Sequence, residues 1–435
     1  MTPKELLPVA PGTATGAKAG PPHRAAPWPE ARAAAARAGS AARAGREPRR
    51  LPLGRALGQV LAEPLLALTD LPSFDTSAMD GWAVAGPGPW TVRAETPVLA
   101  GHAPVAALTS GEAVRIATGA PVPPGTTAVI RTEHSRTERA GALPGPGPLL
   151  HALRDVVSGQ DIRPRGQECR SGDELLPVGT AVTPVVLGLA AAAGYDELPV
   201  PPRPRVEVLV LGDELLTAGL PHEGLIRDAL GPMLGPWLAA LGAEVLATRR
   251  IGDDAEELYA AVTGSAADLV VTTGGTAAGP VDHLHRVLDK AGAALLVDGV
   301  KVRPGHPMLL AALGGGRHLV GLPGNPLAAV SGLLTLAEPL LAALGGTPLA
   351  EGRAPVLDEV HGHPHDTRLV PVVRRGEQLV PLRYNGPAML RGIAVADGMA
   401  VVPPGGARSG QELDVLDLPW SPTSGAVPAQ GACFT

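Results

Sequence analysis

Aromatic residues, cysteine and long apolar runs are all scarce in this sequence of 435 residues. Only five Trp, three Tyr and two Phe are present, so a core must be built mainly from Ala, Val, Leu and Ile. Two cysteines, Cys169 and Cys433, are too few for a disulfide framework and lack the spacing of metal ligands. No uncharged apolar run reaches the roughly 18 residues that a membrane span needs. We therefore expect a soluble protein of the reducing cytoplasm with no membrane partner.

Positive charge is also limited, and it is unevenly distributed. The chain has 36 basic and 42 acidic residues, a net charge of −6. The first 50 residues hold nine Lys or Arg against three Glu, so the rest of the chain carries −12. An acidic body repels a phosphate backbone, which argues against nucleic acid as the main partner. Only four of the basic residues are lysines, which fits a compositional bias as well as any function.

Glycine and proline are abundant, at 56 and 48 residues, and they punctuate aliphatic runs instead of forming one repetitive tract. A chain of this length is expected to split into roughly two to four domains. Residues 30–45 are rich in helix formers and form either a helix or a charged tether, and residues 51–68 have helical apolar spacing. The predicted parts are a disordered arm over residues 1–26, a helical or linker N-terminal domain built from 27–73 and 155–204, a β-rich domain over 74–154, an α/β domain over 205–347, a C-terminal β domain over 350–420 and a tail over 421–435.

The α/β domain is predicted from strands that alternate with helices. Residues 205–214 form a buried apolar run that ends in acids, and apolar residues of 227–241 have helical spacing. The alternation continues through further strands, among them 294–302 and 317–324, to a final helix over 327–344. This order predicts a parallel sheet with helices on both faces. The fold class is therefore a multidomain α/β plus β protein, with a β-rich N-terminal part and a small C-terminal β domain.

Carboxylates follow three of the predicted strands. They are Asp213 and Glu214, Asp253 and Asp254, and Asp282. The carboxyl ends of parallel strands form the ligand crevice of an open sheet, and oxygen ligands suit Mg²⁺, which usually keeps waters and substrate phosphates in its shell. The alternative is structural, because Asp253, Asp254 and Asp282 each precede a helix that they could cap. Both interpretations stay open.

Two glycine-rich loops also follow predicted strands, and each is a candidate for anion binding. The first contains Gly274, Gly275 and Thr276, and the second contains Pro323, Gly324 and Asn325. Backbone N–H groups of such loops can approach a phosphate at a helix N-terminus. Ordinary tight-turn chemistry explains each loop equally well when it is taken alone. A further turn carries Arg303 and His306, which could contact phosphate.

Six segments, taken together and in order, resemble the molybdopterin molybdenumtransferases, the MoeA-type enzymes also found as the gephyrin E domain. The resemblance runs from about Leu51 to Leu418. Its most specific part is LPSFDTSAMDGWAV at residues 71–84. The other five are IATGAPVP at 116–123, DIRPRG at 161–166, GDE at 212–214, TGG at 273–275 and GLPGNPLA at 321–328.

The resemblance implies the last step of molybdenum cofactor synthesis. Enzymes of this family bind adenylylated molybdopterin and molybdate, cleave the pyrophosphate with Mg²⁺ or a similar ion, release AMP and insert molybdenum into the dithiolene. The family is a homodimer whose cleft is shared between subunits, and molybdopterin adenylyltransferase is a possible partner. By position, the resemblance implies catalytic roles for Asp80, Thr118, Glu168 and Asp282, substrate binding by Gly274, Gly275, Thr276, Arg303, His306, Pro323, Gly324 and Asn325, and metal binding by Asp213, Glu214, Asp253 and Asp254.

Several polar residues of the family pattern are altered here, all in the α/β domain. The glycine loop continues as Thr276-Ala277 and has Pro280 before Asp282, Ala328 replaces a serine, and Arg303 and His306 replace two lysines. Arginine keeps a permanent charge, whereas histidine is fully charged only below neutral pH. These losses motivate one alternative, a paralogue that binds molybdopterin or a partner without catalysis, in a scaffolding or regulatory role. A second alternative is that the α/β domain uses ATP as the related adenylyltransferase does, although the β-rich domain is extra to that enzyme.

Overall fold

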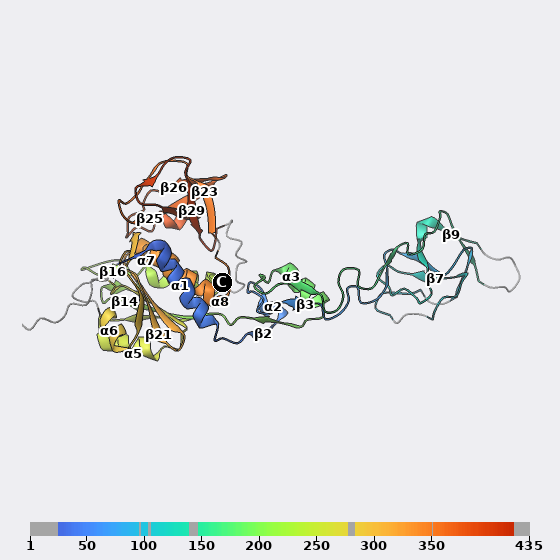
Figure 1. Cartoon of the computed structure of the whole chain (residues 1–435), viewed down its shortest axis with the longest axis horizontal. Helices are drawn as coiled ribbons and strands as arrows, with labels where there is room; N and C mark the ends of the chain where they lie inside the picture. The colour runs from blue at the N-terminus through green and yellow to red at the C-terminus, as the bar shows by residue number, and fades with distance from the viewer. Residues whose placement is uncertain are drawn as a thin grey trace, which may run out of the picture. The chain divides into compact units, whose positions relative to one another are not determined.

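The computed structural model describes residues 25–94, 97–102, 106–138, 147–276, 283–349 and 351–421, and these form two compact units (Figure 1). One unit joins the described residues up to Gly45 to those from Arg203 onward. The other comprises Arg46–Pro202. The predicted N-terminal domain grouped residues 27–73 together, and the structure corrects this because residues 27–45 pack in the α/β unit.

The α/β unit is built on a mixed six-stranded sheet. Four neighbouring strands are parallel, and the fifth runs antiparallel to both of its neighbours, so the sheet is mixed and not wholly parallel as predicted. The physical reason is that the turn of Gly315 and Gly316 joins the two strands beside it directly, whereas a parallel neighbour needs a long crossover. The order is β17 (Glu244–Ile251), β14 (Arg205–Leu211), β18 (Leu269–Thr273), β22 (Arg317–Leu322), β21 (Leu309–Gly314) and β19 (Ala294–Asp298).

Helices cover both faces of this sheet, as the sequence predicts. One apolar cluster contains α4 (Leu230–Ala240) and the long helix that runs through α7 (Pro326–Gly332), the π-helical segment Leu333–Ala337 and α8 (Glu338–Gly345). A second cluster contains α5 (Ala255–Gly264) and α6 (Leu284–Lys290). The stretch Pro326–Gly345 is long and apolar enough to cross a membrane, but 83% of its most apolar window is buried inside the protein. It is a core helix.

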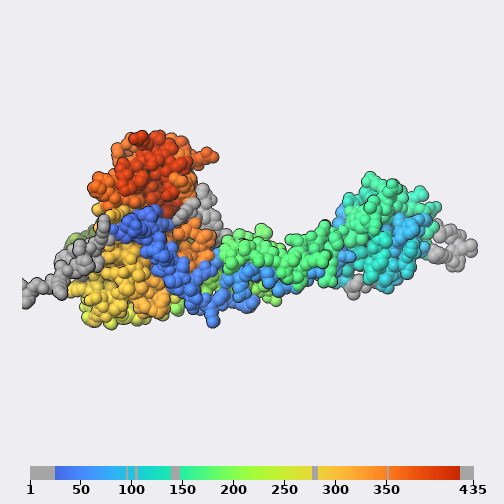
Figure 2. Space-filling model, viewed as in Figure 1, coloured from blue at the N-terminus to red at the C-terminus, as the bar shows by residue number. Residues whose placement is uncertain are grey.

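The segment predicted as either a helix or a tether is helical, and it forms α1 (Trp28–Arg43). This helix packs on the long core helix (Figures 1 and 2). Trp28 Nε1 donates to Thr335 Oγ1 at 3.0 Å, and the Arg32 guanidinium donates to the carbonyl oxygen of Leu334. Gly39 faces α8 so closely that a Cβ there would overlap the carbonyl oxygen of Leu340. These contacts join residues some 300 positions apart, so no local pattern in the sequence assigns α1 to this unit.

The C-terminal β domain forms a sheet that recruits two strands from earlier in the chain. Strand β20 (Val300–Arg303) was predicted as part of a strand of the α/β sheet, but it pairs with β25, and β1 (Ala26–Pro27) pairs with β20. Residue 26 therefore belongs to a strand and not to the predicted arm; residues 1–24 lie outside the described part of the chain. The remaining strands are β25 (Thr367–Arg375), β26 (Gln378–Pro381), β27 (Gly398–Val402), β29 (Glu412–Asp417) and β23 (Glu351–Pro355).

The second unit has a six-stranded sheet over the predicted β-rich segment. Its strands are β8 (Ala128–Arg131), β5 (Gly81–Val84), β7 (Glu112–Ile116), β6 (Trp90–Val92), β10 (Leu149–Ala152) and β9 (Ser135–Glu138). Short two-stranded sheets make up most of the rest: β2 (Arg49–Pro52) with β13 (Glu197–Val200), β3 (Leu65–Leu66) with β12 (Glu174–Leu176), and β4 (Thr76–Ser77) with β11 (Ile162–Arg163).

The predicted helical character of residues 51–68 is wrong. Only α2 (Leu53–Ala56) is helical there, and Leu57 leaves the helix with an extended backbone before Gly58 at φ +76°. The helical spacing of the leucines instead reflects tertiary packing, because Leu61 and Leu65 enter a core shared with α3 (Pro184–Ala192) and β13. The long-range core overrides a weak local preference.

Candidate functional site

The β-rich unit holds Asp80 and Thr118 together, as the resemblance implies. Asp80 directly precedes β5, and its Oδ1 accepts the backbone N–H of Thr118 at 2.8 Å. This hydrogen bond, helped by the charge of Arg115, holds the pKa of the Asp80 carboxyl below its ordinary value. Both residues are exposed. The unit therefore presents an ionised carboxylate at a fixed position on its surface.

Three segments far apart in the sequence fix that position. Ser77 N donates to Ala120 O at 3.0 Å, and Gly119 N donates back to Ser77 O at 2.8 Å. Ala78 N donates to the backbone oxygen of Asp161 at 2.8 Å. The residues before Asp80, the turn of Thr118 and the DIRPRG segment thus form one hydrogen-bonded platform.

An ion pair at this platform was missed by the sequence reasoning. Arg131 donates from Nε and Nη2 to the two carboxylate oxygens of Asp161, at 3.0 Å each. The guanidinium lowers the pKa of Asp161 and keeps it ionised. Asp161 stands in one of the six diagnostic segments, which is a signal in the sequence, whereas Arg131 has none.

Glu168 lies on a neighbouring segment of the same unit. Its backbone N–H donates to Leu71 O at 2.9 Å, beside the bridge between Leu71 and Cys169. Its side chain is exposed. No contact that the structure describes joins it to Asp80 or Thr118, so its catalytic role stays a prediction.

The two glycine-rich loops of the α/β unit lie side by side. Gly274 and Gly275 follow β18 with φ of +81° and +65°, a conformation that favours glycine. Gly274 N donates to Leu322 O at 2.8 Å, and a Cβ on Gly324 would lie 3.7 Å from the Cα of Gly274. Thr276, next in the first loop, is buried. The neighbouring parallel strands β18 and β22 therefore bring both predicted loops to one edge of the sheet.

The start of α7 is not a free anion-binding helix end. The N–H groups of Leu327 and Ala328 both donate to Pro387 O, at 2.8 and 3.1 Å. Of the predicted binding residues here, Pro323 is buried, and Gly324 and Asn325 are exposed. The carbonyl of a residue near the C-terminal β domain thus accepts two N–H groups that the sequence predicted to be available for a phosphate.

Arg303 and His306 are both partly engaged by the protein itself. Arg303 Nε donates to Asp366 Oδ2 at 2.9 Å, and Asp366 is only 8% exposed. His306 Nδ1 lies 2.8 Å from Val300 O. Since a carbonyl oxygen only accepts, Nδ1 carries the proton and a neutral His306 presents Nε2 as an acceptor. Asp366 orients Arg303 and was not singled out from the sequence.

The predicted metal-binding carboxylates take different roles. Asp213 follows β14 and lies beside the end of β17, where a Cβ on Gly252 would be 3.0 Å from its Oδ1. Asp254 caps α5 instead, since its Oδ1 accepts the N–H groups of Glu256 and Glu257 at 2.8 and 2.9 Å. These bonds lower the pKa of Asp254. Of the two interpretations that the sequence left open, metal binding or helix capping, the fold adopts helix capping at Asp254.

The described carboxylates do not form a complete metal site. Within the ranges that the structure describes, no three His, Cys, Asp or Glu side chains are grouped so that they could hold a metal ion. Glu214 and Asp253 are exposed, and Asp282, predicted as catalytic, lies outside the described residues. The carboxylates that the structure describes therefore do not supply a complete set of Mg²⁺ ligands without a substrate.

Family comparisons cover nearly the whole described chain. Residues 27–194 match the MoeA N-terminal region (domain I and II), residues 207–343 match a probable molybdopterin binding domain, and residues 353–418 match the MoeA C-terminal region (domain IV). Molybdopterin molybdenumtransferase 2 of Mycobacterium tuberculosis is 35% identical over 394 residues, covering 85% of this chain and 95% of the relative. Molybdopterin molybdenumtransferase of Bacillus subtilis is 31% identical, covering 84% and 90%. The crystal structure of a molybdopterin biosynthesis MoeA protein from Pyrococcus horikoshii has a TM-score of 0.74 at 25% identity, covering 91% of this chain and 99% of that one.

Proposed function

Because the chain belongs to the molybdopterin molybdenumtransferase family, we propose that it transfers molybdenum from molybdate to adenylylated molybdopterin in the cytoplasm and releases AMP. The observation that carries the proposal is the pair of adjacent loops at Gly274 and Gly324. They lie at the carboxyl edge of the parallel strands, where an α/β sheet binds its ligand. The same edge carries Asp213, whose exposed carboxylate caps no helix in the described part of the chain.

The residues of this chain have separate tasks in the proposal. The loops and the exposed part of the Arg303 guanidinium bind the phosphates and orient the pyrophosphate. Asp366 is a positioning residue, since its bond to Nε aims the remaining guanidinium N–H groups. Asp80, ionised and fixed by Thr118, supplies a negative charge from the β-rich unit. We also propose that a divalent cation such as Mg²⁺ is required and is held chiefly by substrate phosphates, with Asp213 as its protein ligand.

The test is AMP release by the purified chain in a single-turnover assay with adenylylated molybdopterin. We expect release that requires both molybdate and a divalent ion, and that stops when EDTA is added. A family member of known activity, assayed in the same mixture, serves as the control. If that control turns over and this chain does not, the chain is a binder without catalysis and the proposal is wrong. If ATP is consumed with molybdopterin, the chain resembles the adenylyltransferase instead.

We further propose that the chain is a homodimer in which Asp80 of one copy and Asp213 of the other serve the same cleft. Asp80→Asn and Asp213→Asn, each inactive alone, are mixed after mild unfolding and reassembly. A random mixture of dimers restores about one quarter of the wild-type rate, because each mixed dimer has one cleft with both acids intact. The matched control reassembles each variant alone. If both acids of a cleft came from the same chain, the mixture would stay inactive.

A further inference from the structure

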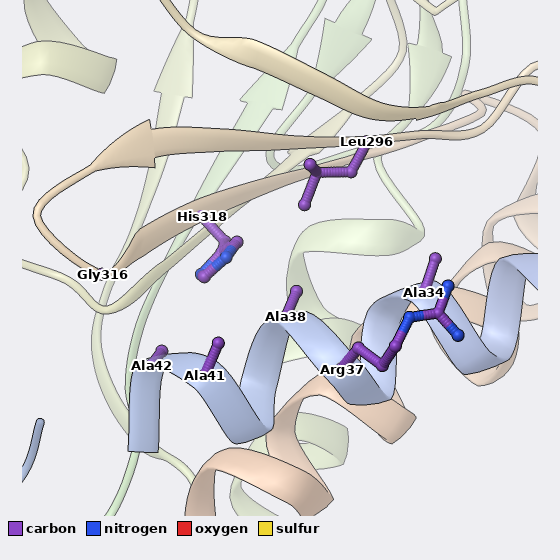
Figure 3. Close-up of a pocket in the computed structure, with 8 residues that line it drawn as sticks. All are labelled: Ala34, Arg37, Ala38, Ala41, Ala42, Leu296, Gly316 and His318. Carbon is purple, nitrogen blue, oxygen red and sulfur yellow. The ribbon is translucent and has the colours of Figure 1, made fainter. Parts of the chain in front are cut away.

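The two outermost strands of the α/β sheet, β17 and β19, have different surroundings. β19 faces the small side chains of α1 across an open pocket (Figure 3). β17 instead ends beside the turn that carries Asp213, the proposed ligand of the cation. Gly212 N donates to Ile251 O at 3.4 Å, and among the described residues no later backbone bond joins the ends of β14 and β17. The next carbonyl groups of the turn therefore have no partner in β17.

The side chain of Arg250 supplies the missing partners. Its Nη2 donates to the carbonyl oxygens of both Gly212 and Asp213, at 3.1 and 3.0 Å. Arg250 is the second-to-last residue of β17, and it is in register with Val210, two residues before Gly212. One guanidinium group thus continues the pairing of β17 with β14 past the point where the backbone bonds end.

These two hydrogen bonds decide where the side chain of Asp213 points. The two carbonyl groups belong to the peptide groups on either side of the Asp213 Cα. Because a peptide group is planar, holding both of them fixes φ and ψ of Asp213, and with them the direction of its Cα–Cβ bond. In the described part of the chain, nothing donates a hydrogen bond to the carboxylate itself. The backbone therefore determines where the carboxylate lies.

Gly252, the first residue after β17, leaves room for that carboxylate. A Cβ there would lie 3.0 Å from Asp213 Oδ1, so close that the carboxylate would have to shift by a few tenths of an ångström. The backbone of Gly252 is not in the left-handed region. Space, and not conformation, is therefore the reason why glycine suits this position.

We propose that Arg250 and Gly252 are positioning residues for the cation: Arg250 fixes the backbone of Asp213, and Gly252 leaves the space that its carboxylate occupies. The inference rests on the proposed function in one respect, the role of Asp213 as the protein ligand of a phosphate-bound divalent ion. Loss of a group that orients a metal ligand typically lowers metal affinity by about 10- to 100-fold.

The experiment is isothermal titration of the full-length chain with inorganic pyrophosphate, in the presence and in the absence of Mg²⁺. The factor by which Mg²⁺ tightens pyrophosphate binding is the Mg²⁺ gain. Asp213→Asn gives the value of this gain without the carboxylate. Arg250→Leu should lower the gain about tenfold, toward the Asp213→Asn value, because Asp213 is no longer held in place.

The sign of the change separates positioning from other roles of Arg250. If the guanidinium acted only through its charge, its removal would let Asp213 attract Mg²⁺ more strongly, and the gain would rise. If it merely stabilised the sheet, pyrophosphate binding would weaken with and without Mg²⁺, and the gain would stay the same. Arg250→Lys keeps a charge and N–H donors at this place, and it should recover most of the gain.

Arg249→Leu is the matched control. Arg249 is the preceding residue of β17, and its Nε donates to Glu207 Oε1 at 2.6 Å. It is in register with Leu209, which packs in the cluster of α5 and α6, whereas the Val210 partner of Arg250 packs in the cluster of α4. The control removes the same charge from the same strand but from the opposite face of the sheet. The Mg²⁺ gain should not change.

Gly252→Ala tests the same position with no change of charge. The added methyl group displaces the Asp213 carboxylate and should lower the Mg²⁺ gain. Gly264→Ala is its control, because a Cβ on this last residue of α5 meets nothing within 4 Å, and it should leave the gain unchanged.

The inference is wrong if Arg250→Leu leaves the Mg²⁺ gain unchanged or raises it. It is also wrong if the wild type shows no gain, since Asp213 then holds no cation. AMP release by the same preparations tests the proposed function separately. A wild-type chain that shows the gain and the expected pattern of variants, but releases no AMP, would refute the transferase activity and keep the positioning roles of Arg250 and Gly252.

Discussion

Replacing Asp80 by asparagine should slow AMP release by about 100-fold or more without unfolding the protein, because it removes a fixed negative charge from the proposed site. Asparagine has nearly the same shape, and its amide oxygen can still accept the Thr118 N–H that now lies 2.8 Å from Oδ1. The loss should therefore fall on kcat more than on KM. Single-turnover AMP release and the melting temperature, measured on the same preparation, check both parts.

The pH dependence of Asp80 has a defined sign. Its pKa is lowered because the ionised form accepts the Thr118 N–H. The carboxylate is thus present throughout the neutral and mildly acidic range, and both its charge and its stabilising contribution are lost only as pH falls through the lowered pKa. In the ordinary carboxyl range, AMP release by the wild type and by Asp80→Asn should therefore depend on pH in the same way.

Glu112→Gln is the matched control for Asp80→Asn. Its Oε2 accepts the backbone N–H of Thr109 at 2.8 Å, and this bond lowers the pKa of Glu112 in the same way. Glu112 belongs to the same unit but lies outside the six diagnostic segments. Its variant should release AMP at the wild-type rate. An equal loss in both variants would mean that the platform is merely destabilised, and a normal rate in Asp80→Asn would exclude Asp80 from the reaction.

Replacing Gly81 by alanine should destabilise the β-rich unit by about 3 kcal/mol or more, at the upper end of overpacking effects. Gly81 stands at the start of β5, between β7 and β8. A Cβ there would overlap the carbonyl oxygen of Ile130 and lie 2.8 Å from its carbonyl carbon. Because the obstacle is the backbone of a paired strand, no side-chain rotation relieves the contact. Hydrogen exchange of peptides covering β5 and β8 should rise sharply.

Gly188→Ala is the matched control, with the opposite expected sign. Gly188 lies exposed in α3 of the same unit, and a Cβ there meets nothing within 4 Å. Alanine at that position should stabilise the helix by about 0.5–1 kcal/mol. If Gly81→Ala unfolds at the same denaturant concentration as the wild type, the close approach of β5 to β8 does not constrain this position.

The sequence by itself determined the class of fold, the family and the edge of the sheet at which the binding loops meet. Alternating strands and helices, together with six ordered segments, carry that information locally. Parallel strands place their carboxyl ends together, so the proximity of the loops at Gly274 and Gly324 follows from connectivity alone. Asp80 and Thr118 also stand in two of the diagnostic segments, so the motifs alone indicate that both belong to the site.

Only the tertiary structure decided which partners the remaining polar groups and helices take. The stripe of alanines in α1 fits any apolar surface of suitable shape, and the bonds of Trp28 and Arg32 to a helix some 300 residues away select one. The same holds for the Pro387 carbonyl at the start of α7 and for Asp366 beside Arg303. Periodicity and motifs describe neighbours along the chain, whereas these contacts depend on how separate elements pack, and that packing determines which donors and charges remain free for a ligand.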